Sequence, residues 1–245
     1  MRHFGFQNVR ARVRQLFLEL GIQDFPVSPE TLFEKMDVPL LRFSQLISDG
    51  YSNAVKTWRL KGIEALCWKK GFQYIVFYDD ETLYPDRIPF TLAHEFAHIY
   101  LNHHCKSDGQ PIPRMVKTAK LDFREKEADE FAGELLAPVA ILYLSNATDS
   151  WIVQRCYRVS SISAKVRVKK LEESTRNGKL YNHPVPFFLQ HFHDFLFRCY
   201  CPHCGFTFVE QAKYCPSCGN SKLMWGNFNH PYYDKWQKSK KETSY

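Results

Sequence analysis

The sequence lacks any long apolar run and any strong excess of one charge. No stretch approaches the roughly 20 consecutive apolar residues that a membrane-spanning helix needs, and the first residues contain no apolar run of signal-peptide length. We therefore expect a soluble cytoplasmic protein, in a compartment that keeps thiols reduced. The net charge of +7 is moderate, so it permits contact with nucleic acid or an acidic protein surface but indicates neither.

The composition is that of a globular protein. Hydrophobic residues make up 44% of the chain and aromatic residues 16%, which excludes a disordered chain. A length of 245 residues allows one sizeable core and a small additional module. Eight cysteines in a reducing compartment indicate metal ligands before disulfides.

The first part of the chain predicts an α+β fold with a small sheet. Apolar spacing and turn residues predict helices at 8–20 and 28–36 and strands at 39–43, 63–68 and 72–78. Gly71 suits a hairpin turn between the last two strands because glycine tolerates a positive φ. Cys67, inside one of these strands, is expected to be a buried and inert thiol.

The segment that follows, residues 91–100, has the features of a buried helix that carries a metal site. The helical period places His94 and His98 one turn apart on one face, where both can bind a zinc ion. Glu95 is then placed to take a proton from a water at that zinc. The alternative is a core helix whose imidazoles are satisfied by local hydrogen bonds, because five-residue patterns also occur by chance.

A second helix, predicted over residues 122–136, offers a third ligand. One of its faces carries Glu125, Ala128, Asp129 and Ala132. The small side chains allow close packing on another helix, Glu125 completes a three-ligand zinc site, and Asp129 can hydrogen-bond an imidazole. Glu127 is the rival third ligand. A solvated charged face is the alternative to a site, but it does not explain the interleaved alanines.

Three polar residues follow the first of these helices: His103, His104 and Cys105. They are candidates for an extra ligand set or for polarising a substrate carbonyl. The favoured interpretation is that they only terminate the helix, where a cationic side chain is stabilised by the helix dipole.

Two Cys-Pro-x-Cys-Gly knuckles near the end of the chain predict a zinc ribbon over residues 199–223. Its four thiolate ligands are Cys201, Cys204, Cys215 and Cys218. A Cys₄ zinc site is closed and structural, so no chemistry is expected there. The module is too small to bury a core, and zinc should supply its folding energy.

Two further segments precede this ribbon, and one follows it. Residues 149–175 predict two helices, which resemble a helix-turn-helix pair. The second helix is basic, but we favour a solvated surface over DNA contact for it. Residues 176–198 form a connecting aromatic segment that should pack on a neighbouring module, with His191 and His193 left unassigned. Residues 224–245 are expected to be a mobile tail unless a partner orders them.

The two motifs together resemble the ImmA/IrrE family of metallopeptidases, through residues 87–103 and 125–138 in particular. The resemblance extends over roughly residues 10–175. It implies a zincin-like fold in which the His-Glu-x-x-His helix and Glu125 bind zinc. It also implies cleavage of a helix-turn-helix repressor of a mobile element or stress regulon.

We therefore predict a metallopeptidase domain at 1–175, followed by the connection, the ribbon and the tail. The expected activity is a zinc-dependent endopeptidase with Glu95 as general base and two zinc ions, one catalytic and one structural. The expected partner is a protein substrate, with nucleic-acid contact through the ribbon or the basic helix left open. The alternatives are a DNA-binding regulator and a protein-binding adaptor, each with a metal site that does not cleave.

Overall fold

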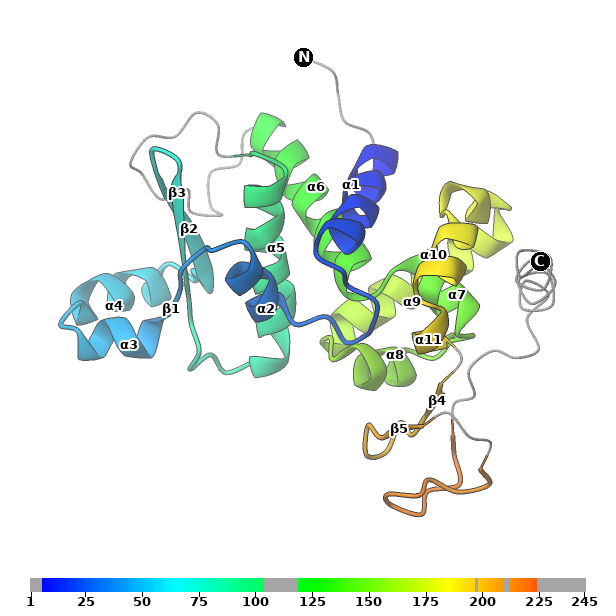
Figure 1. Cartoon of the computed structure of the whole chain (residues 1–245). Helices are drawn as coiled ribbons and strands as arrows, with labels where there is room; N and C mark the ends of the chain where they lie inside the picture. Colours follow the sequence, from blue (N-terminus) through cyan, green and yellow to red (C-terminus); the bar gives the residue numbers. More distant parts are fainter. Residues whose placement is uncertain (1–5, 104–118, 197, 209–211, 224–245) are drawn as a thin grey trace. The chain divides into compact units, whose positions relative to one another are not determined.

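The computed structural model describes residues 6–103, 119–196, 198–208 and 212–223 (Figure 1). His104, Cys105 and the tail at 224–245 lie outside these ranges. The chain forms two compact units. Unit 1 contains residues 1–20 and 28–135, and unit 2 contains residues 21–27 and 136–245. The predicted domain at 1–175 thus spans unit 1 and part of unit 2, and its boundary stays a prediction.

Unit 1 is built around a small mixed sheet, as the predicted α+β class requires. Its strands are β1 (Leu40–Arg42), β2 (Ala65–Lys70) and β3 (Gln73–Tyr78). They lie in the order β1-β3-β2, with β1 parallel and β2 antiparallel to β3. Gly71 turns the predicted hairpin with φ 60°.

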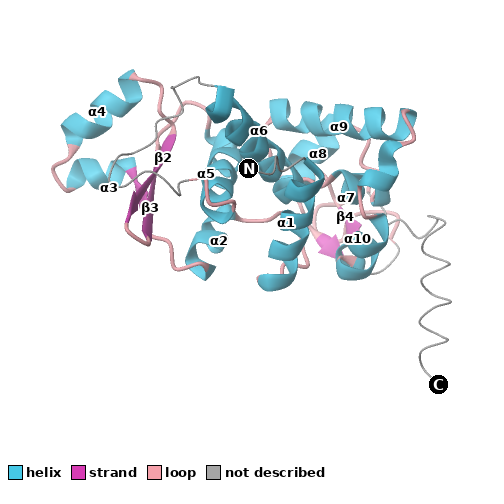
Figure 2. Cartoon of the chain, turned by 90° about the horizontal axis from the view of Figure 1, so that it is seen from above, coloured by secondary structure: helices cyan, strands magenta, loops and turns pink. Residues whose placement is uncertain are grey.

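One face of the sheet is covered by two short helices that the sequence did not predict, α3 (Phe43–Ser48) and α4 (Ser52–Leu60). Leu66 and Phe77 are partners across β2 and β3 and join a buried cluster with residues of these helices. Cys67 alternates with Leu66 along β2, so it points to the opposite face, where α5 packs (Figure 2). The sheet therefore forms a layer between the α3–α4 pair and α5.

Four further helices complete the described part of unit 1: α1 (Phe6–Glu19), α2 (Pro29–Lys35), α5 (Ile88–Tyr100) and α6 (Ala119–Leu136). A single 3₁₀ turn, η1 (Pro85–Arg87), leads into α5. Ser28 caps α2 by accepting a hydrogen bond from the Thr31 backbone N–H, as its sequence indicated. Every residue of α5 from Thr91 to Tyr100 is buried, so α5 is the central helix of the unit.

Contacts between aromatic rings join α2 and α6 to α5, and an ion pair joins α1 to α6. Phe96 contacts Phe33 of α2 with ring centroids 5.4 Å apart. Phe131 of α6 lies 5.6 Å from the ring of Tyr100. Arg10 of α1 donates to the buried Glu130 of α6 at 2.8 Å. The contact between Tyr100 and Phe131 joins α5 directly to α6, the two helices that carry the predicted site.

Unit 2 contains the short helices that follow α6. They are α7 (Val139–Leu144), α8 (Ser150–Tyr157), α9 (Ser161–Arg176), η2 (Lys179–Asn182), α10 (Val185–His191) and α11 (His193–Leu196). Asp149 caps α8 and Ser160 caps α9, which confirms the predicted helix pair. Arg167 of α9 is buried and donates to the Ala137 carbonyl at 2.8 Å, so it does not belong to a basic surface. The favoured interpretation of α9 as a solvated surface, with DNA contact as the alternative, stays a prediction.

The connecting segment and the ribbon also belong to unit 2. Phe192 and Phe195 of the aromatic segment pack on Phe25, with ring centroids 5.0 and 5.1 Å away. The ribbon contains β4 (Cys199–Tyr200) and β5 (Thr207–Phe208), which pair antiparallel. Within the described residues, no helix is both long and apolar enough to cross a membrane.

Substituting Phe131 by alanine should lower the free energy of unfolding by about 3–5 kcal/mol, because the side chain is fully buried between α5 and α6. Phe72→Ala is the matched control: this ring is 100% exposed on the hairpin, and its loss should change stability by less than about 0.5 kcal/mol. Urea denaturation of both variants measures the difference. Equal effects would contradict the packing described for α6.

Candidate metal centre

Two helices bring three of the predicted residues to one point. The Nε2 atoms of His94 and His98, one turn apart on α5, lie 3.0 Å from each other. Glu125 of α6 places its two carboxylate oxygens 3.2 Å from the His94 Nε2 and 3.3 Å from the His98 Nε2. The three ligand atoms lie within 4.8 Å of one another, a spacing that one ion can bridge.

The hydrogen bonds around His94 set its tautomer. Its Nδ1 lies 2.9 Å from a carboxylate oxygen of Asp129, as the sequence predicted. A carboxylate only accepts, so the Nδ1 of His94 carries the proton. The Nε2 of neutral His94 then presents a lone pair to Glu125 and His98. A carboxylate behind an imidazole is the usual arrangement at a zinc-binding histidine.

The rival ligand Glu127 occupies a different position. Its carboxylate lies 3.4 Å from the Nε2 of His103, while the Nδ1 of His103 lies 2.9 Å from the Nδ1 of His98. His103 does follow the end of α5, but the favoured interpretation of it was incomplete because its ring contacts a residue of the site. That contact depends on the conformation of the turn after α5. In the sequence, only the spacing of five residues between His98 and His103 could have indicated it.

Burial and charge shift the titration of the central groups in the metal-free protein. Burial by itself lowers the pKa of His94, but hydrogen bonds to Asp129 and Glu125 and the charge of Glu95 outweigh it and raise that pKa to about 9. Burial raises the pKa of Glu125, yet its contacts with both histidines bring the net pKa well below the usual range. At neutral pH His94 is therefore protonated, and its positive charge lies at the point where a metal ion would bind.

Glu95 is buried on the same helix as the histidines, at 8% exposure. Burial, and then the negative charge of Glu95, raise the pKa of the Cys67 thiol far above its usual range. Since a protonated thiol is a poor nucleophile and a poor ligand, the inert role predicted for Cys67 agrees with its surroundings.

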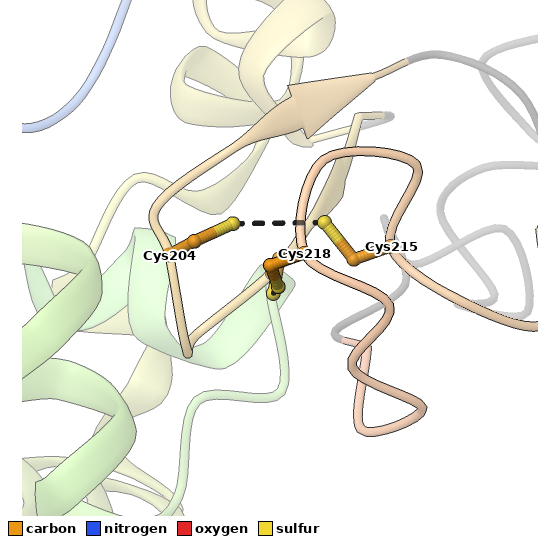
Figure 3. A group of neighbouring side chains, drawn as sticks. Cys204, Cys215 and Cys218 are labelled. Atoms are coloured by element: carbon orange, nitrogen blue, oxygen red, sulfur yellow. Dashed lines mark hydrogen bonds between the residues drawn. The ribbon is translucent and has the colours of Figure 1, made fainter.

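The four ribbon cysteines also converge. The sulfurs of Cys201 and Cys218 lie 3.6 Å apart. Those of Cys204 and Cys215 are also 3.6 Å apart, and Figure 3 shows these two side chains pointing toward each other. Burial raises the pKa of Cys201, but hydrogen bonds from the backbone of residues 203–204 and from Asn220 lower it to about 6. Cys201 therefore favours the thiolate, the form that binds zinc.

Both donor sets fit zinc chemically. Two imidazole nitrogens and one carboxylate form a three-ligand set with room for a further ligand, whereas four thiolates form a closed tetrahedral set. At the first site, the two Nε2 atoms lie 3.0 Å apart, and a proton or a bound cation between them relieves the repulsion of their lone pairs.

A His-Glu-x-x-His helix under a small mixed sheet, joined by a glutamate from a second helix, defines a metallopeptidase centre. Residues 33–169 match the family model of Peptidase_M78, the IrrE N-terminal-like domain. This match covers more than half of the chain, and the chain belongs to that family. Comparison with curated proteins gives no match.

The pKa of His94 predicts how the metal-free protein responds to pH. Its value of about 9 lies above the roughly 6.5 of an unfolded histidine, so the stabilisation is present below pH 6.5 and is lost as pH rises to 9. His94→Gln lacks this group. The stability advantage of the wild type over His94→Gln should therefore shrink by on the order of 1–3 kcal/mol across that range. Urea denaturation of chelator-treated proteins measures it, and an advantage independent of pH would contradict the assigned contacts.

Proposed function

We propose that the protein is a zinc-dependent endopeptidase that cleaves an intracellular protein. The observation that carries this proposal is the convergence of His94, His98 and Glu125 around one point, with Glu95 on the same buried helix. Membership of a metallopeptidase family supports it. The ribbon cysteines hold a second, structural zinc in this proposal.

Each residue of the centre has a separate role in the proposed peptide hydrolysis. His94, His98 and Glu125 hold the zinc, which when bound supplies Lewis acidity toward the scissile carbonyl and lowers the pKa of water. Glu95 accepts the proton of the attacking water and delivers it to the leaving amine. Burial of Glu95 keeps solvent from competing for that proton. Asp129 holds His94 in the tautomer that ligation requires.

The substrate in this proposal is a helix-turn-helix transcriptional repressor of a mobile element or stress regulon. This part rests on the resemblance to the ImmA/IrrE family. Repressors encoded beside the gene are the first substrates to test, because such proteases act on regulators of their own element.

Replacing Glu95 by glutamine should lower kcat/KM for a cleaved repressor by about 10²–10⁴-fold, because the amide cannot accept the water proton. Zinc content should stay unchanged, since Glu95 is not one of the three converging ligands. Incubation of the purified proteins followed by intact mass spectrometry measures the cleavage.

Glu34→Gln is the matched control for this experiment. Glu34 lies exposed on α2, far along the chain from the motif, and its loss should leave both cleavage and zinc content unchanged. Cleavage by Glu95→Gln at the wild-type rate would overturn the role of general base. A variant that loses zinc would instead show that Glu95 supports the metal site itself.

Zinc content separates the two proposed sites. Wild-type protein should contain two zinc ions per chain, and His94→Ala/His98→Ala should contain one, because only the cysteine site remains. Cys215→Ser/Cys218→Ser should also contain one. Elemental analysis of the purified proteins measures these values. One zinc in both the wild type and the histidine variant would overturn the catalytic site.

A further inference from the structure

The turn that ends α5 directs His103 back onto the helix. Asn102 adopts a left-handed conformation with φ 57°. The backbone N–H of Asn102 donates to the Ile99 carbonyl at 3.0 Å, and that of His103 donates to the His98 carbonyl at 2.9 Å. This pair of bonds is a Schellman motif, which brings the second residue beyond the helix over the residue five positions earlier. His103 therefore lies against His98 because of the backbone.

The ring of His103 completes a chain of polar contacts behind His98. Its Nε2 lies 3.4 Å from the carboxylate of Glu127, which favours a proton on that nitrogen. Its Nδ1 is then an acceptor, 2.9 Å from the Nδ1 of His98. That leaves the proton of neutral His98 on Nδ1 and the lone pair on Nε2, facing Glu125.

This chain is built into the core of unit 1. His103 is 7% exposed and Glu127 is 6% exposed. Arg124, one turn before Ala128 on α6, donates to the His103 carbonyl at 2.7 Å and ties the turn to that helix. Two buried polar residues held in this way have little freedom to move, so they can fix the ring that they contact.

Carboxylates of α6 thus stabilise the two histidines of the centre in different ways. Asp129 contacts His94 directly, whereas Glu127 reaches His98 through His103. Glu125 and Glu127 are two positions apart on α6 and so point to different sides of it. This explains why Glu127 does not compete with Glu125 for the centre.

We propose that His103, backed by Glu127, is a positioning residue that fixes the ring and the tautomer of His98 for metal binding. The proposal rests on the proposed function, because it needs a metal at His94 and His98. Loss of a group that orients a ligand histidine typically lowers metal affinity 10–100-fold.

The test compares two substitutions, one that keeps a hydrogen-bond acceptor and one that keeps a ring. His103→Asn keeps an acceptor oxygen at the place of the Nδ1, whereas His103→Phe keeps a ring and removes the acceptor. Zinc affinity of the full chain is measured by competition with a chromophoric chelator, using zinc alone as the probe. His103→Phe should bind the site zinc 10–100-fold more weakly, and His103→Asn should recover most of that loss. His193→Ala on α11, outside this network, is the control.

The outcomes separate this inference from the proposed function. A wild type that binds only the cysteine-site zinc overturns both. A wild type that binds two zinc ions, with His103→Phe unchanged, overturns the inference alone. Equal weakening in His103→Asn and His103→Phe also overturns it, because that result shows only a packing role.

Discussion

The centre between α5 and α6 depends on one electrostatic requirement. Two imidazole nitrogens 3.0 Å apart, in a buried helix and beside carboxylates, must have a positive charge between them. Without metal, that charge is a proton on His94, whose pKa is raised to about 9. Zinc held by His94, His98 and Glu125 would supply that charge instead, and its binding would release the proton. A proton on His94 therefore stabilises the metal-free helix pair below about pH 9.

The acid-rich helix α6 is shaped by this requirement and by packing, and not by solvation. Ala128 and Ala132 are fully buried, which lets the helix approach α5 closely. Glu130 and Glu134 are also buried, and both lie near Arg10 of α1. The acids of α6 thus face two different basic partners. Glu130 and Glu134 can be buried on this charged helix because Arg10 on a neighbouring helix is their cationic partner.

Local periodicity was enough to predict the central residues of the site. The spacing of His94 and His98 on α5 and the face shared by Glu125 and Asp129 on α6 follow from 3.6 residues per turn. The position of His103 did not follow, because it depends on a left-handed Asn102, and asparagine only weakly signals that conformation. The burial of Arg167 and the parallel pairing of β1 with β3 were missed for a related reason: both are set by long-range contacts.

The ribbon is stabilised by hydrogen bonds to α8 in addition to its cysteine ligands. Arg155 of α8 donates to the backbone carbonyls of Pro202 and His203 at 2.6 and 2.8 Å, within the first knuckle. Tyr200 in β4 donates in return to the Arg155 carbonyl at 3.1 Å. Because these groups are the backbone of the ligand loop, they hold the loop near its metal-binding shape. Zinc bound by the four cysteines would therefore couple through α8 to the folding of unit 2, because ligand geometry and folding stabilise each other.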